Sequence, residues 1–272
     1  MQPLAPHTFI YTALPAEAKP LVDYFKLKKR VTVTPFAVYE HDGVCLTVTG
    51  LGKTAMAAGV AYTQALFMPV APVMLNVGIA GHQSHALGQL YQADKIIDAD
   101  SQKRYYPSLV VSPPCPTWCV QTSAQPQLDY NHAHLCDMEA SAFYETAVRF
   151  TTNVGIASFK VVSDNADSPA KLIVAPQASA LIGAHLAPIG AWLNTANAML
   201  AYLRTTESGL AKQLLQTYHF TANEQVQLTA LLSRWVLVSN DQPLMMDESS
   251  LPNAKAVLRW LEMRIKDTDF YL

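Results

Sequence analysis

Short apolar runs rich in strand-forming residues alternate with longer helical stretches through most of this chain. The strand-like runs cover residues 8–13, 44–49, 73–78, 94–98, 117–122 and 154–162, and the helical stretches include 15–26, 53–68 and 139–150. Such alternation is typical of a mostly parallel sheet with helices on its faces. The sequence therefore predicts an α/β fold.

Composition narrows the class of protein. Half of the 272 residues are apolar, 15% are charged and the net charge is −2. We expect a well-buried core in one large domain, or in one domain with an appendage. Nothing in this charge favours a nucleic acid or an anionic membrane as partner. The sequence shows no secretory signal and no apolar run of transmembrane length, so we expect a cytoplasmic protein.

The four cysteines are expected to be reduced thiols, and no cofactor is expected. Cys115 and Cys119 lie near His132 and His134 in the sequence, which leaves a metal site open as an alternative. The spacing lacks the second matching pair that a zinc site would need.

The character of the chain changes near residue 198. Residues 168–195 are Ala-rich and helical, whereas 199–216, 221–237 and 252–266 read as amphipathic helices with no strand between them. We predict a domain over 1–197 and a helical extension over 198–272. The apolar face of that extension should be buried against the α/β core or a second subunit; a separate ligand-binding module is the alternative. This face is expected to include Val226, Leu228, Leu231, Leu232 and Trp235.

The most informative segment for function is 137–167. It places Glu139 at the start of a helix and Asp164 at the end of the following strand. Polar residues just past the carboxyl ends of strands line the ligand crevice of an open α/β sheet. A poorly solvated carboxyl group at that position is suited to donate a proton. Structural roles remain open at this point, because Asp164 is also suited to cap a turn and Glu139 to sit at a helix N-terminus.

Several motifs resemble one known family. Met138-Glu139-Ala140 and Val162-Ser163-Asp164 resemble the signature of the nucleoside phosphorylase/nucleosidase superfamily (purine nucleoside phosphorylase family 1). The 5′-methylthioadenosine/S-adenosylhomocysteine nucleosidases are the most similar branch. Segments 9–17, 48–53 and 75–81 agree with it in order, so the resemblance covers about residues 8–195. It implies a three-layer phosphorylase-like fold, with a mostly parallel mixed sheet flanked by helices, to which this chain adds a C-terminal helical appendage.

The resemblance also implies roles for individual residues. Asp164 would protonate the leaving base, Glu17 would activate water, and Glu139 would bind the ribose hydroxyls with Met138 against the sugar. From the residues alone, Glu17 could instead be an acidic residue in the first turn of a helix. The remaining substrate-binding residues implied by the resemblance are Ile79, Ala80, Gly81, Ser163 and, from a shortened base-binding loop over 120–128, Ser123 and Gln125.

Cleavage of a nucleoside N-glycosidic bond is the predicted function, with hydrolytic release of a purine-type base. In phosphorylases of this superfamily an arginine and a serine that hold phosphate stand where this chain has Asn76 and Ile79. Neither residue supplies a positive charge, which favours water as nucleophile. A phosphate-dependent phosphorylase and a catalytically silent nucleoside sensor remain alternatives. The segment 104–107 resembles one that reaches a neighbouring subunit in the family, so a homo-oligomer, with a dimer favoured, is expected.

Overall fold

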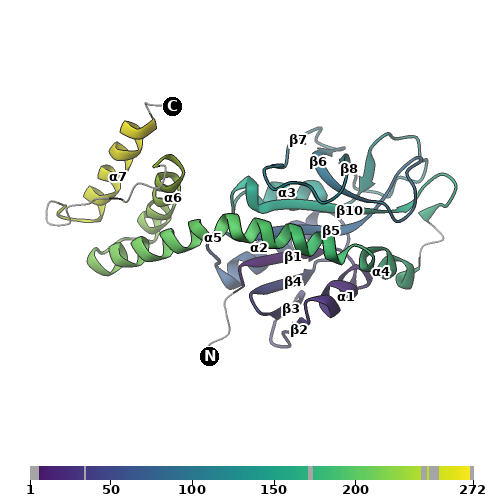
Figure 1. Cartoon of the computed structure of the whole chain (residues 1–272), viewed down its shortest axis with the longest axis horizontal. Helices are drawn as coiled ribbons and strands as arrows, with labels where there is room; N and C mark the ends of the chain where they lie inside the picture. The colour runs from purple at the N-terminus through teal and green to yellow at the C-terminus, as the bar shows by residue number, and fades with distance from the viewer. Residues whose placement is uncertain (1–5, 34, 171–173, 240–243, 245–250, 270–272) are drawn as a thin grey trace. The chain divides into compact units, whose positions relative to one another are not determined.

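The computed structural model describes residues 6–33, 35–170, 174–239, 244 and 251–269. Within them the chain divides into two compact units, Met1–Leu200 and Ala201–Leu272. The first is an α/β unit and the second is helical (Figure 1). The predicted α/β class and the helical character of the C-terminal segment are thereby found in the structure.

The ten strands of the described chain form one mixed sheet. They are β1 (Thr8–Thr12), β2 (Lys28–Lys29), β3 (Ala37–His41), β4 (Val44–Val48), β5 (Val73–Gly81), β6 (Leu90–Asp98), β7 (Arg104–Tyr105), β8 (Thr117–Thr122), β9 (Leu135–Asp137) and β10 (Ile156–Asp164). β5 lies between β1 and β10 and is parallel to both. β10 also pairs antiparallel with β6, and the pairings β6–β8, β8–β9 and β9–β5 close a ring of five strands.

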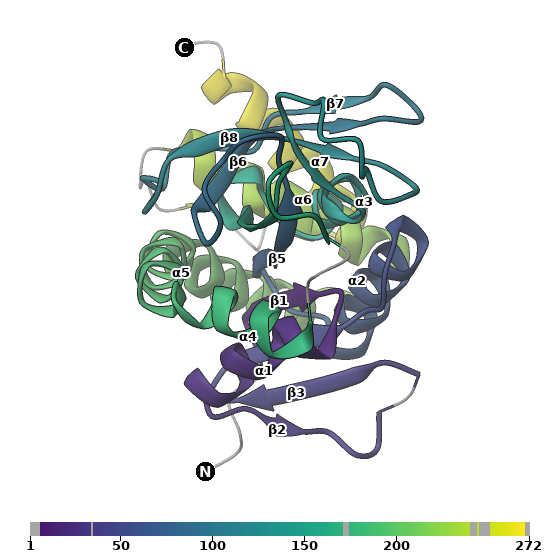
Figure 2. The same ribbon diagram turned by 90° about the vertical axis from the view of Figure 1, so that its right-hand side faces the viewer.

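Two pairs of helices pack beside the central strands. The helices of this unit are α1 (Pro15–Tyr24), α2 (Lys53–Phe67), α3 (Ala140–Ala147), α4 (Ala175–Gly183) and the first part of α5 (Leu186–Thr217), with a short 3₁₀ turn at Asn153–Gly155. α2 packs on α3, and α1 packs on α4. Figure 2 shows the two pairs on different sides of β1 and β5. Strands β5 and β10 are buried along nearly their whole length, as expected for strands covered on both faces.

Two features of the fold differ from the sequence-based expectation. β3 and β4 form a hairpin, of which the sequence predicted only the β4 strand. The Ala-rich stretch over 168–195 is not one helix: α4 ends at Gly183 and α5 begins at Leu186. Pro188 explains the break, because it has no amide hydrogen and its ring would clash with the carbonyl of Ala184 in a continuous helix. Part of that stretch, 171–173, lies outside the described residues.

The C-terminal unit has an apolar core of its own. Its helices are the remainder of α5, α6 (Ala222–Val238) and α7 (Ala254–Asp269), and α6 packs on α7. Thr221 caps α6, because its hydroxyl accepts from the Glu224 amide and the Glu224 carboxylate accepts from the Thr221 amide. The fully or nearly fully buried residues of this core include Leu214, Phe220, Leu228, Leu232, Val257, Leu258 and Leu261.

One residue of the predicted apolar face is exposed. Leu228, Leu232 and Trp235 are buried as expected, but Val226 is 71% exposed. Successive helical residues are 100° apart, so Val226 lies about 200° from Leu228 on the opposite side of α6. Val226 is therefore exposed in the single chain, and its burial against a second subunit stays a prediction. The buried face follows the spacing of Leu228, Leu232 and Trp235 instead.

The core of the C-terminal unit can be tested by a matched pair of truncations. Leu261→Ala removes a side chain with no exposed surface and should destabilise this unit by about 2–5 kcal/mol. Val226→Ala removes exposed atoms and should change stability by less than about 0.5 kcal/mol. Urea unfolding followed by circular dichroism measures both. Equal effects of the two substitutions would contradict the packing described above.

Candidate active site

A cavity of about 380 Å³ opens at the carboxyl ends of the parallel strands β1, β5 and β10. Eight of the ten residues that the sequence predicted as site residues line it: Glu17, Ile79, Ala80, Gly81, Met138, Glu139, Ser163 and Asp164. Four carboxyl groups face it, those of Glu17, Glu139 and Asp164 together with Asp137. The described lining contains no lysine, arginine or histidine.

The other two predicted residues, Ser123 and Gln125, are not among the described residues that line the cavity. Ser123 is buried, and its amide donates to the carbonyl of Asp137 at 2.9 Å, which extends the β8–β9 ladder. Gln125 is exposed. The same loop reaches the cavity three residues later than Ser123, through Pro126, Gln127 and Leu128. Any contact of Ser123 and Gln125 with a base stays a prediction.

Glu17 is held at the start of α1 by three backbone amides. Oε2 accepts from Ala13 at 3.0 Å and Leu14 at 2.9 Å, and Oε1 accepts from Ile79 at 3.0 Å. These bonds fix the carboxyl group between β1 and β5, so Glu17 serves the helix start and lines the cavity at once. Burial raises the pKa of Glu17, although the amides and a nearby lysine act in the opposite direction.

That lysine, Lys160, was not singled out in the sequence. It lies in the middle of β10, has 1% of its surface exposed, and its Nζ lies 2.7 Å from Oδ2 of Asp137. Burial alone would lower the pKa of Lys160, but the charges of Asp137, Glu139 and Glu17 outweigh burial and raise it. Lys160 is therefore an ammonium among three carboxyl groups. The signal that the sequence offered was a lysine as the one charged residue of the strand-like run 154–162.

Gly78 leaves room for this cluster. A methyl group added at Gly78 would lie 3.1 Å from Oε1 of Glu17 and 3.3 Å from Nζ of Lys160. Both contacts are tighter than ordinary van der Waals packing, so glycine at this position of β5 lets the two charged groups approach across the strand.

Glu139 is the N-cap residue of α3, yet its side chain makes no capping bond there. Two neighbours satisfy the first amides of the helix instead. Asp137 Oδ2 accepts from Ala140 at 2.8 Å, and Thr122 Oγ1 accepts from Ser141 at 3.0 Å. The Glu139 carboxylate is turned to another segment, where Oε1 accepts from the amide of Gly52 at 2.7 Å. Because Asp137 and Thr122 cap the helix, the Glu139 side chain is left to line the cavity.

Burial and the charge of Asp137 raise the pKa of Glu139 to about 7, against the opposing effects of Lys160 and the Gly52 amide. The ionised form of this side chain is thus less favourable in the folded protein than in water. Such a group at a cavity wall is typical of functional sites.

A bulge in β10 brings two consecutive residues to the cavity. Val162 pairs with Ala80 but Asp164 pairs with Gly81, so Ser163 is the extra residue. Ser163 Oγ donates to Asp164 Oδ1 at 2.5 Å. A methyl group added to Gly81 would lie 2.6 Å from Asp164 Oδ2. Only glycine at position 81 therefore leaves Asp164 in this place.

The second oxygen of Asp164 also accepts a hydroxyl. Tyr130 donates to Oδ2 at 2.9 Å, while the amide of Ala170 donates to the Tyr130 oxygen at 2.7 Å. Because the phenol oxygen accepts from Ala170, its own proton is directed at Asp164. Tyr130 comes from the loop between β8 and β9, and sequence reasoning did not identify it.

A second cavity, of about 460 Å³, lies beside the first and shares Ser163 with it. Its other lining residues are Leu87, Gly88, Ser168, Pro169, Gln177, Ala180, Leu181 and Ala184. It is the larger of the two, but its described lining has no titratable side chain. We therefore place the chemistry in the cavity with the carboxyl groups. Among the described residues, no group of three or more His, Cys, Asp or Glu is arranged to hold a metal ion.

Comparison with solved structures identifies the architecture. The chain matches the Helicobacter pylori 5′-methylthioadenosine/S-adenosylhomocysteine nucleosidase with a TM-score of 0.58 and 12% identity over 70% of this chain and 99% of that one. The α/β unit has the nucleosidase fold. The Arabidopsis thaliana 5′-methylthioadenosine nucleosidase gives a TM-score of 0.58 and 16% identity over 72% and 97% of the two chains.

A third match is to an enzyme with a different activity. The futalosine hydrolase of Helicobacter pylori gives a TM-score of 0.59 and 12% identity over 70% of this chain and 98% of that one. No family model matches the sequence, and no curated protein matches it. The predicted phosphorylase/nucleosidase fold is confirmed by these structures. No described helix has the length and apolar character needed to cross a membrane.

The raised pKa of Glu139 generates a prediction about stability. A carboxyl group with a raised folded pKa favours folding only while it is protonated, so stability is lost as the pH rises from its ordinary pKa through about 7. Glu139→Gln keeps the shape without the charge. It should stabilise the protein by on the order of 1–3 kcal/mol at about pH 8, and far less at about pH 5.

Thermal unfolding of wild type and variant at the two pH values makes this measurement. Glu145→Gln is a matched control, because Glu145 lies on the same helix, is partly exposed and pairs with Lys103. A variant that is destabilised at the higher pH would show that ionised Glu139 is favourable in the fold.

Proposed function

We propose that this protein cleaves the N-glycosidic bond of a purine-type nucleoside with water. The observation that carries the proposal is the 380 Å³ cavity, with four carboxyl groups and no cationic side chain in its described lining. Breaking an N-glycosidic bond builds positive charge on the ribose and negative charge on the base. A site for this step needs an acid for the base and negative charge near the sugar.

Asp164 is the proposed acid. It would donate a proton to a ring nitrogen of the departing base. The hydroxyls of Ser163 and Tyr130, which already face its two oxygens, would then stabilise the carboxylate that remains. General acid catalysis of this kind contributes on the order of 10²–10⁴-fold to the rate.

Glu17 and Glu139 are proposed to act on the sugar side. Glu17, fixed by three amides and with a raised pKa, would accept a proton from the attacking water. Glu139 would accept hydrogen bonds from the ribose hydroxyls and stabilise the developing cation, with Met138 against the sugar face. Ile79, Ala80 and Gly81 would form the floor below the ribose. The resemblance to nucleosidases and the location of these residues in one cavity support the assignment.

Water is favoured over phosphate as the nucleophile. Asn76 is buried and its Nδ2 donates to the carbonyl of Tyr11, while Ile79 contributes an apolar side chain to the cavity. A phosphate dianion would therefore meet carboxyl groups and no compensating cation among the described lining residues. Repulsion between like charges in a poorly solvated cavity opposes its binding.

The role of the C-terminal unit and the oligomeric state of the protein are also proposals. All described cavity residues belong to the unit Met1–Leu200, so we propose that residues 201–272 are structural and not catalytic. A homodimer is proposed from the resemblance of 104–107 to a subunit-contacting segment. Arg104 and Tyr106 are exposed in the single chain, as such a contact requires. A cytoplasmic location is proposed from the sequence.

The function is tested by incubating the protein with purine nucleosides, including 5′-methylthioadenosine, in the presence and absence of millimolar phosphate. We expect free base at a rate that phosphate does not change, with the free sugar as the other product. Asp164→Asn is the control that ties the activity to this cavity, and it should lower the rate by on the order of 10²-fold or more.

Three outcomes would contradict the proposal in different ways. A sugar 1-phosphate, formed only when phosphate is present, would identify a phosphorylase. Nucleoside binding without release of base would identify a sensor. Base release that survives Asp164→Asn unchanged would remove Asp164 from the mechanism.

A further inference from the structure

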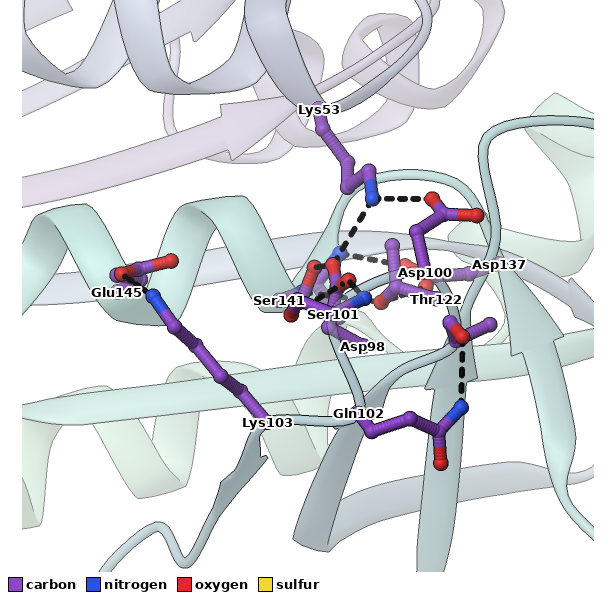
Figure 3. Close-up of polar contacts among 12 residues, drawn as sticks. Lys53, Asp98, Asp100, Ser101, Gln102, Lys103, Thr122, Asp137, Ser141 and Glu145 are labelled. Atoms are coloured by element: carbon purple, nitrogen blue, oxygen red, sulfur yellow. Dashed lines mark hydrogen bonds and ion pairs between the residues drawn. The ribbon is translucent and has the colours of Figure 1, made fainter.

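Asp98, at the end of β6, receives four hydrogen bonds. The donors are Lys53 Nζ at 3.0 Å, Ser141 Oγ at 2.7 Å, and Ser101 through its amide at 2.8 Å and its hydroxyl at 2.9 Å. Figure 3 shows Lys53 and Ser141 reaching it from two different helices. Burial would raise the pKa of Asp98, but the bonds from Ser101, Ser141 and Lys53 hold it well below its ordinary range. Asp98 is an ionised carboxylate that joins three chain segments.

The two helices that Asp98 joins begin on either side of Glu139. Lys53 is the first residue of α2 and directly follows Gly52, whose amide donates to Glu139. Ser141 is the second residue of α3 and comes two positions after Glu139. Asp98 therefore fixes the donor of the Glu139 hydrogen bond from one side and the backbone of Glu139 from the other, although it is not among the residues that line the cavity as described.

The turn that carries Gly52 has no side-chain cap of its own. Gly50 and Gly52 have φ values of 91° and 92°, a conformation that glycine adopts readily and other residues rarely do. Gly52, the N-cap residue of α2, has no side chain to cap the helix, and the first turn of α2 contains no acidic residue. The ion pair of Lys53 with Asp98 is a specific tie between this start of α2 and the strand below.

We infer that Asp98, with Lys53 and Ser141, is a positioning clamp that holds Glu139 in the orientation needed to bind the ribose hydroxyls. This inference rests on the proposed function. Loss of the clamp would let the α2 and α3 starts move independently, and Glu139 would lose the alignment on which a hydrogen bond of 2.7–3 Å depends. The defect should be specific to substrates that carry the hydroxyls.

The chain provides a matched control in Asp100. Lys53 Nζ also pairs with Asp100, but Asp100 is 55% exposed and makes no bond to Ser141. Exposed ion pairs contribute little, and Lys53 keeps its partner Asp98 when Asp100 is neutralised. Asp98→Asn and Asp100→Asn each remove one negative charge that pairs with Lys53. Only Asp98→Asn also removes the carboxylate that binds Ser141.

The test compares a ribonucleoside with its 2′,3′-dideoxy analogue. Asp98→Asn should lower kcat/KM for the ribonucleoside by about tenfold or more and change it much less for the analogue, so that discrimination between the two falls by about tenfold. Asp100→Asn should leave the discrimination within about twofold of wild type. Lys53→Met should reproduce the Asp98→Asn defect, and Lys53→Arg, which retains the ion pair, should largely restore discrimination.

If the role of Asp98 were merely structural, Asp98→Asn would lower kcat/KM equally for both substrates, and that result would overturn the inference. Unchanged discrimination in Asp98→Asn and Lys53→Met would overturn it as well. If Asp98→Asn does not fold, the comparison of Lys53→Met with Lys53→Arg decides the question. Wild type that releases no base would instead contradict the proposed function. The same variants are then compared by calorimetric binding of the two nucleosides, where retained selectivity for the hydroxyls would overturn the clamp.

Discussion

The buried ion pair between Lys160 and Asp137 is the interaction on which the candidate site depends. Its nitrogen and oxygen lie 2.7 Å apart, with 1% and 0% of the two side chains exposed. An isolated charge in such a place would be strongly unfavourable, so each partner requires the other. Two further carboxyl groups, those of Glu17 and Glu139, lie around this pair. Their pKa values are raised, because burial makes the ionised form of each less favourable. Lys160 is the single described ammonium among them.

Each carboxyl group of the site is held by a different device. Glu17 is fixed by backbone amides from the segment after β1 and from β5. Glu139 accepts from one amide, while Asp137 and Thr122 cap α3 in its place. Asp164 is brought to the cavity by a strand bulge and by the absence of a side chain at Gly81. These arrangements aim acidic groups into one cavity, which would help the proposed reaction, because that reaction passes through a cationic sugar.

The sequence could predict those parts of the site that depend on local order along the chain. Glu139 at a helix start and Asp164 at a strand end follow from the change between apolar strand and amphipathic helix, and both positions are found in the structure. The partners that surround Lys160 could not be predicted in this way. Its burial is possible only because carboxyl groups from segments far away in the sequence surround it, and no local pattern reports that.

The loop between β8 and β9 was the hardest part to predict for a related reason. Its hydrogen bonds, not its composition, decide which residues reach the cavity. The Ser123 amide is taken up by the β9 backbone, and the loop therefore reaches the cavity through Gln127 and its neighbours, while Tyr130 contacts Asp164. Pro188 shows the opposite case, since its effect on the helix at 184–186 is local and could have been recognised in the sequence.

The pH dependence of unfolding in Lys160→Met tests the central claim most directly, namely that one ammonium balances the carboxyl groups of this cavity. Removal of one partner from a buried pair costs about 3–5 kcal/mol. We predict a deficit of this order relative to wild type at about pH 8, where Glu139 is ionised, and a clearly smaller deficit at about pH 5, where Glu139, with a pKa of about 7, is protonated. A deficit that is the same at both pH values would show that Lys160 stabilises the fold by packing alone, and would contradict the account.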